Sequence, residues 1–511
     1  MLVLKENRYS FSPIISIADY FSFKLKIIYL KDLIPSKNEV YNDETVYKFI
    51  ENQFSMLKID REFNIFFFSI HSWYRKFFML VLKLLKENFP ESLFISGGPD
   101  VIANPYLYID YFDLICNSEG ESFLIDFFNI INQLKEKNEI DINPQEIHNC
   151  ISNKYSIRIS KRNTKYEIKK YHSTSSIVSN KNGIDLFKNF LQNFYIKFSE
   201  QLFPYGKSKL TIYKIEKNDL NQILNRILIK INQINDYKEI FKFFPSFPVI
   251  SSFYHPVEIV RGCPQGCYYC QVSNIFGKNF RKKDLDIVKV FLSYQIRNGK
   301  NHIRFISPDF ALFFHGKKIE DDIQNWESLI SFIKYESEKI NSPFYIYLGS
   351  FPSELSLRFL KTNYLELISK YSSTKKITIG IQTASKRLQK IINRSDPLDN
   401  IEGILRDCIK YNLEPIIDII FGLPYENIDD RDITLSFLEK NLNNKISANI
   451  HYFLPIPGTN FQNEVPVKLS NEEIKRIKRL MSKGLVSGNF FRQMAEFENR
   501  LQMPITYLQN L

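Results

Sequence analysis

Hydrophobic residues along the first 135 positions fall into short runs that alternate with longer amphipathic stretches. The short runs predict five strands, at 2–5, 26–30, 64–69, 92–96 and 113–117. The stretches between them have the apolar spacing of helices, near 12–21, 44–54, 76–87 and 121–134. Strands alternating with helices in this way are typical of a parallel sheet with helices on both faces. The sequence therefore predicts an α/β fold with a doubly wound, Rossmann-like domain over residues 1–135.

Polar and glycine residues gather where three of these predicted strands end. In doubly wound sheets ligands bind beyond the carboxyl ends of the strands, so we expect these residues to form a site. They are Ser69 and Ser72 after the third strand, Gly97 and Gly98 after the fourth, and Glu119 and Gly120 after the fifth.

A second α/β domain is predicted from residue 248 to 460. Six apolar runs separated by helical stretches predict strands at 257–260, 303–306, 344–348, 377–381, 416–420 and 450–453. Six such units indicate a partial (β/α)6 TIM-like barrel, in which active residues follow the carboxyl ends of the strands. Residues 136–247 are interpreted as a connector with a small insertion, containing a hairpin at 155–169 and helices at 184–200 and 219–234. Residues 461–511 are interpreted as a helical cap, with helices at 471–482 and 490–501.

Composition narrows the class of protein. The chain has 511 residues, of which 44% are hydrophobic and 15% aromatic, which excludes a disordered chain. Six cysteines are too few for a disulfide framework. The net charge is +12, but the lysines are dispersed, so solvated faces are favoured over a nucleic-acid site. The chain shows neither a signal pattern nor an apolar run of membrane-spanning length. We therefore expect a cytoplasmic protein with no membrane partner.

The first turn of the predicted barrel carries Cys263, Cys267 and Cys270, in the pattern Cys-x3-Cys-x2-Cys. Three thiolates at this spacing can hold three corners of a [4Fe-4S] cluster, and no fourth cysteine lies nearby in the sequence. One iron is then free to bind a small molecule. A structural zinc site is the alternative, but zinc needs four protein ligands and the nearest fourth candidate is His255. The trio therefore predicts an iron–sulfur site with one open position.

This cysteine pattern, with Tyr269 before its last cysteine, resembles the radical S-adenosylmethionine (radical SAM) superfamily. The resemblance implies that the open iron binds the amino and carboxylate groups of SAM, and that Tyr269 packs beside the adenine. With its six strand-end turns, the chain most resembles an uncharacterised archaeal group of radical SAM proteins with a cobalamin-binding domain. The resemblance implies that further polar side chains meet SAM, namely Ser307 (in place of the usual Gly-Gly-Glu), Ser350, Glu354, Gln382 and Arg394.

The N-terminal domain resembles the cobalamin-binding domain of cobalamin-dependent radical SAM enzymes, through residues 96–99 and 112–121. That resemblance implies cobalamin as a third cofactor beside the cluster and SAM. The histidine motif that ligates cobalt in cobalamin mutases is absent after the first predicted strand. A domain of the same fold without a ligand is therefore the alternative.

These resemblances imply an enzyme that reductively cleaves SAM at a [4Fe-4S] cluster, with the three cysteines as its catalytic and metal-binding residues. They further imply a cobalamin-dependent methyltransferase with an unknown substrate and a ferredoxin or flavodoxin as electron donor. Three alternatives remain open. They are rearrangement or cyclisation with cobalamin unused, a methylthiotransferase-like enzyme acting on RNA or protein, and a non-catalytic iron–sulfur sensor. Methylthiotransferases carry a second cysteine trio, whereas only Cys116 and Cys150 precede the barrel here.

Overall fold

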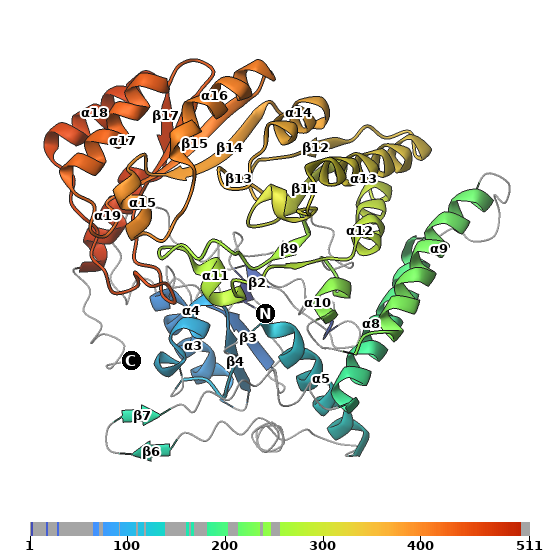
Figure 1. Cartoon of the computed structure of the whole chain (residues 1–511). Coiled ribbons are helices and arrows are strands. Elements are labelled where there is room, and N and C mark those ends of the chain that lie inside the picture. Colours follow the sequence, from blue (N-terminus) through green and yellow to red (C-terminus); the bar gives the residue numbers. More distant parts are fainter. Residues whose placement is uncertain are drawn as a thin grey trace. The chain divides into compact units, whose positions relative to one another are not determined.

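A computed structural model of the chain describes two compact units, Met1–Phe253 and Tyr254–Leu511 (Figure 1). Each unit has its own parallel sheet and its own buried core, so the predicted α/β fold is confirmed in both. The finer division at residues 135, 247 and 460 stays a prediction. The described residues are 2–3, 17–18, 28–29, 65–70, 75–90, 92–108, 111–116, 119–137, 160–162, 165–167, 181–202, 213–235, 239–246 and 256–501.

The N-terminal unit is built on five parallel strands in the order β2-β1-β3-β4-β5. All five predicted strands are confirmed, as β1 (Leu2–Val3), β2 (Ile28–Tyr29), β3 (Ile65–Ser69), β4 (Leu93–Gly97) and β5 (Leu114–Ile115). The strand order reverses between β1 and β3, which is where sheets of this kind bind ligands. The loops that follow β1 and β3, at residues 4–16 and 71–74, lie outside the described residues.

The central strands of this sheet are apolar on both faces because helices cover both. On β3, Phe67 meets Phe127 of α5 (Gly120–Lys137) edge-on at 5.7 Å, while Phe68 meets Phe78 of α3 (Arg75–Asn88) at 6.3 Å. Consecutive phenylalanines thus fill opposite sides of the sheet. Helices α3 and α5 match the predicted ones, the predicted helix at 44–54 lies outside the described residues, and of the helix at 12–21 only residues 17–18 are described, as helical.

The predicted connector contains the predicted hairpin and both predicted helices. The hairpin is β6 (Ser160–Arg162) with β7 (Lys165–Glu167), and the helices are α8 (Lys181–Leu202) and α9 (Tyr213–Asn232), which lie side by side in Figure 1. A short helix, α10 (Ile240–Phe243), packs against α8 through Phe244, which stacks on Phe190 at 5.7 Å. In addition, Tyr195 donates a hydrogen bond to the carbonyl of Phe243 at 2.6 Å. These contacts anchor α8 against the segment that precedes the second unit.

Parallel strands of the second unit form two sheets, β12-β11-β8 and β13-β14-β15-β16-β17. The backbone N–H of Thr378 donates to the carbonyl of Gly349 at 2.8 Å and so joins the second sheet to the residue that follows β12. All six predicted strands are confirmed, as β8 (Val257–Glu258) with β9 (Val260–Arg261), β11 (His302–Ile306), β12 (Tyr345–Tyr347), β14 (Lys376–Gln382), β15 (Glu414–Phe421) and β16 (Ser447–Tyr452). Two more parallel strands, β13 (Leu355–Ser356) and β17 (Val486–Gly488), are present, and β10 (Arg281–Lys282) pairs with β9.

Alternating burial along β15 distinguishes the two faces of the larger sheet. Ile417, Ile419 and Phe421 are fully buried, whereas Asp418 and Ile420 on the other face are only partly buried. The fully buried face lies under the helical layer, so the partly buried face lines the barrel interior. The helices of this unit are α11 (Gln271–Phe276), α12 (Leu285–Arg297), α13 (Ile319–Lys339), α14 (Thr362–Tyr371), α15 (Lys386–Ile391), α16 (Ile401–Lys410) and α17 (Ile428–Asn441).

The C-terminal segment differs from the predicted helical cap. Its helices α18 (Asn471–Ser482) and α19 (Phe490–Leu501) match the prediction, but β17 lies between them and pairs in parallel with β16. The expectation of a purely helical segment is therefore wrong. The run Val486–Gly488 holds one apolar residue and ends in glycine, so its sequence gives no strand signal.

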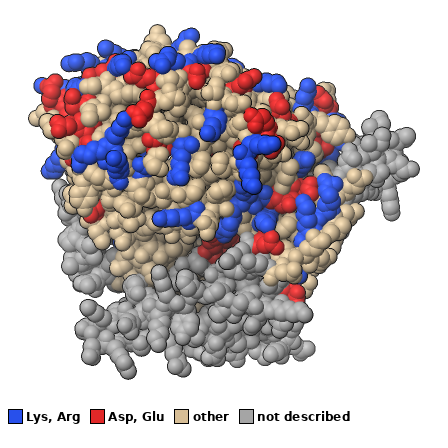
Figure 2. Space-filling model, in the orientation of Figure 1, with Lys and Arg blue, Asp and Glu red and all other residues tan. Residues whose placement is uncertain are grey.

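The described residues show the dispersed charge that the sequence predicts. On the face shown in Figure 2, basic and acidic side chains are interspersed rather than separated into fields of one sign. Among the described helices, none is both long and apolar enough to cross a membrane.

Candidate functional site

The cysteine loop runs from the end of β9 to the start of α11. Gly262 has a φ of 87°, which favours glycine, and lets the chain turn out of the strand. The backbone N–H of Cys263 donates to the carbonyl of Gly277, and that of Cys270 donates to the carbonyl of Cys267, both at 3.1 Å. These bonds hold the three predicted cysteines on one short loop at the carboxyl edge of the barrel.

The three thiols are free and lie close enough to influence one another. Burial raises the pKa of Cys263 and raises that of Cys270 to about 11, and charge on Cys267 raises the pKa of both. Three thiolates together in this loop therefore need a cation to neutralise them. Among the described residues, no three His, Cys, Asp or Glu side chains are placed to hold one metal ion. In a [4Fe-4S] cluster each thiolate would bind a different iron.

Arg394 is the buried cation beside this loop. Its Nη1 donates to the hydroxyl of Tyr269 at 3.0 Å and lies 3.8 Å from the sulfur of Cys267, its Nη2 donates to the carbonyl of Gly380 at 2.6 Å, and its Nε binds Asp396. Burial alone would lower the pKa of this guanidinium, but Tyr269, Asp396 and Cys267 raise it, so Arg394 stays charged. These four contacts leave one of its five N–H groups for a ligand. Arg394 thus mainly braces the cysteine loop against β14.

Tyr269 is held in place by contacts at both ends of its side chain. Its ring packs against a buried apolar cluster, and Arg394 holds its hydroxyl. The cluster consists of Leu388, Ile392, Leu423, Phe453 and Phe461. Burial raises the pKa of Tyr269 well above its ordinary value, so the phenol stays protonated. Its packing beside an adenine stays a prediction.

The turn after β11 is held together by its own residues. Ser307 is buried, and its hydroxyl donates to the carbonyl of Asp309 at 2.5 Å. The carboxylate of Asp309 accepts from the backbone N–H groups of Ala311 and Ser356, each at 2.7 Å, and burial raises its pKa to about 6. The hydroxyl of Ser307, expected to meet SAM, is therefore engaged within the turn after β11, which Asp309 links to β13 by a hydrogen bond.

Two further predicted residues follow β12. The hydroxyl oxygen of Ser350 accepts from Nη1 of Arg304 at 3.3 Å, so a lumenal arginine of β11 holds this serine. Burial raises the pKa of Glu354 to about 7, a nearby charge on Asp418 adds to this shift, and Arg394 opposes it. Glu354 therefore lies among the charged groups of the barrel interior.

Gln382 ends β14 in a strained conformation. The pairing of β14 with β15 shifts register between Gly380 and Gln382, and Gln382 has a φ of 71°. Few residues other than glycine adopt such a φ, and bulges of this kind redirect side chains near functional sites. A Cβ on Gly380 would lie 2.8 Å from Nε2 of Gln382, so the missing side chain at 380 makes room for this amide. Gln382 thus lies beside the segment that Arg394 binds.

Asp418 was overlooked in the sequence analysis. It lies on the lumenal face of β15, and its Oδ1 is buried with no hydrogen-bond partner among the described residues. Burial raises its pKa to about 6, against the opposing effects of Asn449 and Arg394. A buried carboxylate oxygen without a partner is suited to a hydroxyl or amine of a ligand. The available signal was one carboxylate inside the apolar run of residues 415–421.

The carboxyl edge of the N-terminal sheet brings several other predicted residues together. Ser69 pairs in register with Gly97, and a Cβ on Gly97 would lie 3.4 Å from that of Cys116. Gly98 has a φ of 98°, and a Cβ there would lie 2.8 Å from the nitrogen of Ile70. Close packing of the chain against itself therefore accounts for glycine at 98. Of the remaining predicted residues, Glu119 and Gly120 lie half-buried at the start of α5, and Ser72 lies outside the described residues.

An ion pair braces the same edge. Asp100 of α4 (Pro99–Ala103) is fully buried and accepts from Nε and Nη2 of Arg75, each at 2.7 Å. The hydroxyl of Tyr108 also donates to this carboxylate. Arg75 begins α3, so the pair fixes the segment after β3 to the segment after β4.

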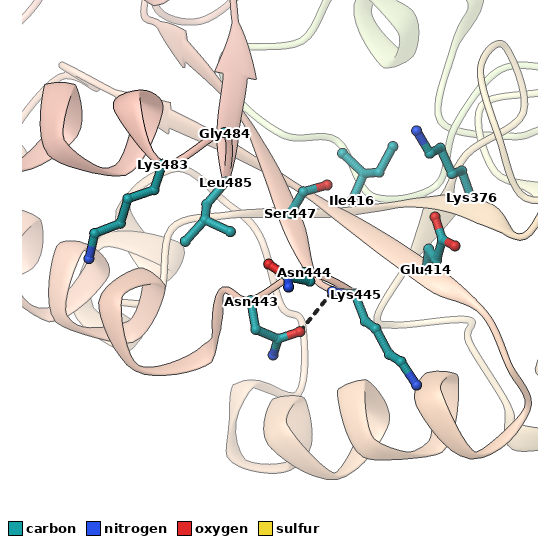
Figure 3. Close-up of a pocket in the computed structure, with 10 residues that line it drawn as sticks. All are labelled: Lys376, Glu414, Ile416, Asn443, Asn444, Lys445, Ser447, Lys483, Gly484 and Leu485. Atoms are coloured by element: carbon teal, nitrogen blue, oxygen red, sulfur yellow. Dashed lines mark hydrogen bonds between the residues drawn. The ribbon is translucent and has the colours of Figure 1, made fainter.

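The cavity drawn in Figure 3 lies at the opposite end of the barrel from the cysteines. Its volume is about 390 Å³, and its strand residues lie at the amino ends of β14 to β17. The side chains of Lys376, Lys445 and Lys483 extend in different directions, so its cations do not converge. Because barrel chemistry takes place at the carboxyl ends of strands, this cavity is not the candidate site.

A comparison with protein families matches the Radical SAM superfamily to residues 257–438. This range begins at β8, includes the cysteine loop and ends in α17. The predicted radical SAM domain is therefore confirmed over these residues.

Curated relatives match about half of the chain. An uncharacterised protein of Methanocaldococcus jannaschii is 27% identical over 51% of this chain and 55% of its own length. The bacteriochlorophyllide d C-12(1)-methyltransferase of Chlorobaculum tepidum is 23% identical over 41% of this chain and 42% of its own length. The chain thus spans roughly half the length of these relatives.

Solved structures give a longer match at low identity. Two structures of the radical SAM methyltransferase TsrM from Kitasatospora setae cover 89% of this chain, with TM-scores of 0.50 and 0.51 at 10% identity. The match covers 70% and 72% of those chains. At this identity the likeness concerns the fold alone.

Proposed function

Residues 257–438 are a radical SAM domain, and from this we propose an enzyme that reductively cleaves SAM at a [4Fe-4S] cluster held by Cys263, Cys267 and Cys270. The observation that carries this proposal is the group of three mutually interacting thiols beside the buried cation Arg394. Held by these three cysteines, a cluster would supply the electron for reductive cleavage of SAM.

The interior of the barrel offers matching groups for SAM. Glu354 and Asp418 are carboxylates that can accept hydrogen bonds from the two ribose hydroxyls. Their proximity to each other and to Arg394 supports this role. Gln382 adds an amide at the end of β14, and the remaining N–H of Arg394 can donate to the methionine carboxylate. We assign Ser307 to support of its own turn instead of direct contact with SAM.

We further propose that the N-terminal unit binds cobalamin and that the reaction is a methyl transfer. The strand order β2-β1-β3-β4-β5, the fold likeness to TsrM and the bacteriochlorophyllide methyltransferases among the relatives support this assignment. The sequence after β1 has no histidine, so cobalt would lack a protein imidazole from that loop. The electron donor would be a ferredoxin or flavodoxin in a reducing compartment, the cytoplasm.

Methylthiotransfer is less well supported, although enzymes of that class also appear among the relatives. Of the two cysteines that precede the barrel, Cys116 is buried beside Gly97. A rearrangement or cyclisation remains the competing outcome of the same SAM cleavage.

Anaerobic reconstitution tests the proposal. The protein should bind close to four irons and four sulfides, and with a strong reductant and SAM it should slowly form 5′-deoxyadenosine. Cys263→Ala should abolish both, whereas the matched control Cys408→Ala, at a buried cysteine of α16, should keep both. S-adenosylhomocysteine formed together with 5′-deoxyadenosine and substrate turnover supports methyl transfer. Product formed without a methyl label from SAM would favour rearrangement or cyclisation.

A further inference from the structure

A row of polar side chains crosses the lumenal face of the larger sheet. Gly380 of β14 pairs in register with Asp418 of β15, Asp418 with Asn449 of β16, and Asn449 with Ser487 of β17. The residues in this row lie on one face of the sheet because paired residues of neighbouring strands share a face. Asp418, which offers a carboxylate to the proposed SAM site, is thus directly followed by two polar residues on the same face, of which Ser487 is exposed.

One hydrogen bond joins the last two residues of this row. The hydroxyl of Ser487 donates to Oδ1 of Asn449 at 2.6 Å, which fixes the orientation of the Asn449 amide. With its Oδ1 bound by Ser487, Asn449 has its amide NH2 left for Asp418, its register partner on β15, and the Asn449 side chain lowers the pKa of that carboxyl against the effect of burial. Oδ1 of Asp418 remains buried without a partner among the described residues. The row therefore supports the ionised carboxylate and leaves one of its oxygens for a ligand.

We propose that Asn449 and Ser487 are positioning residues for the SAM site, acting through Asp418 by orienting its carboxylate. This inference rests on the proposed function, because it takes the ligand of Asp418 to be SAM. It assigns a role to β17, which lies in the C-terminal segment beyond the matched residues 257–438.

Other titratable groups near Asp418 also influence the pH dependence of the site. Arg394 lowers the pKa of Asp418, and a charge on Asp418 raises that of Glu354. His451 lies two residues after Asn449 on the same face of β16, and burial lowers its pKa, which keeps the imidazole neutral near pH 7. None of these groups is removed in the variants below, so a change in pH dependence reports on the row itself.

The test is the affinity of the reconstituted, unreduced protein for SAM, measured anaerobically from pH 5.5 to 8.5. Asn449→Leu removes the amide paired with Asp418, and the pH below which SAM affinity falls should rise by about one unit. Asn449→Asp places a second carboxylate beside Asp418 and should move it further upward. Ser487→Ala, at an exposed position that tolerates substitution, should give a smaller shift in the same direction.

Ser447→Ala is the matched control, because Ser447 lies on the same face of β16 but lines the cavity at the amino ends of the strands (Figure 3). It should leave the pH profile unchanged. Loss of affinity that is equal at every pH in the Asn449 and Ser487 variants, or no loss at all, would overturn the inference. A wild-type protein that carries its cluster and binds no SAM at any pH would instead overturn the proposed function.

Discussion

Each of the two units has an aspartate with a buried carboxylate oxygen in or next to its parallel sheet, and the two aspartates differ in their hydrogen-bond partners. In the N-terminal unit Asp100 is fully buried, and Arg75 and Tyr108 hold its carboxylate. In the C-terminal unit Asp418 is buried at Oδ1 with no partner among the described residues. One carboxylate thus joins two loops, whereas the other has an oxygen with no partner among the described residues.

The same contrast separates the glycines. Gly98 is required where the chain packs on Ile70, while Gly380 leaves room for the amide of Gln382 beside Arg394. A glycine at a strand end therefore indicates a ligand site only if no other part of the chain fills the space beside it. A carboxylate there indicates one only if the chain's own donors do not bind its oxygens. In the C-terminal unit Asp418 and Gly380 meet these conditions, whereas Asp309 does not, because its carboxylate accepts from the backbone of Ala311 and Ser356. In the N-terminal unit, the loops after β1 and β3 that would line a ligand site lie outside the described residues.

The largest effect is expected from Arg394→Met. This change leaves Asp396, whose side chain is buried, without its cation, and breaking a buried pair costs about 3–5 kcal/mol. It also removes the N–H group nearest to the sulfur of Cys267. Iron per chain and the thermal midpoint should both fall. The control Lys386→Met removes an exposed cation of the same unit whose partner Asp399 is also exposed, and it should leave the thermal midpoint nearly unchanged. Full iron content in Arg394→Met would contradict this role.

Asp100→Ala should destabilise the N-terminal unit by about 3 kcal/mol, because it leaves Arg75 and Tyr108 without their shared acceptor. Hydrogen exchange should speed up in peptides covering residues 75–108 and stay unchanged in the cysteine loop, and iron content should stay the same. Lys83→Gln, at an exposed position of α3, is the control. Equal loss of protection in both units would break the distinction between the two edges.

Acidic pH should weaken SAM binding. Burial raises the pKa of Glu354 to about 7 and that of Asp418 to about 6, so these carboxyls become protonated as the pH falls through this range. Since both pKa values lie above those of the unfolded chain, the folded apo protein binds more protons, and these two groups make it less stable as the pH rises from about 4 to 7. Affinity for SAM should change in the opposite sense and rise with pH.

Titration of the wild type beside Glu354→Gln and Asp418→Asn measures this dependence. Each single variant should flatten the affinity profile between pH 5.5 and 7.5. If SAM affinity rises as the pH falls, these carboxylates do not act as acceptors for SAM.

The smallest effects concern the glycine pair of the N-terminal edge. Gly98→Ala should cost about 1 kcal/mol or more, because the φ of 98° disfavours alanine and its Cβ would lie 2.8 Å from a backbone nitrogen. Gly97→Ala should cost less, because its Cβ meets that of Cys116 at 3.4 Å. Thermal midpoints of the two variants give the order. Equal midpoints would show that close packing does not distinguish these glycines.

The local sequence pattern was sufficient to predict much of the fold and the cysteine trio. Strand runs such as 303–306 and 416–420 are long enough to show their period, and the three cysteines lie within eight residues of one another. The contact of Arg394 with Cys267 spans 127 positions and leaves no local signal. Strand β17 has too few apolar residues to be recognised and forms because β16 offers a free edge. Asp418 could be placed only once the register of β14, β15 and β16 was known.

One measurement tests the central claim most directly. The anaerobically reconstituted protein is incubated with SAM and a strong reductant, and iron, zinc and 5′-deoxyadenosine are quantified in the wild type and in Cys263→Ala, Cys267→Ala and Cys270→Ala. Close to four irons per chain and 5′-deoxyadenosine in the wild type alone are the predicted result. Stoichiometric zinc on these thiols, with no iron uptake and no 5′-deoxyadenosine, would contradict it.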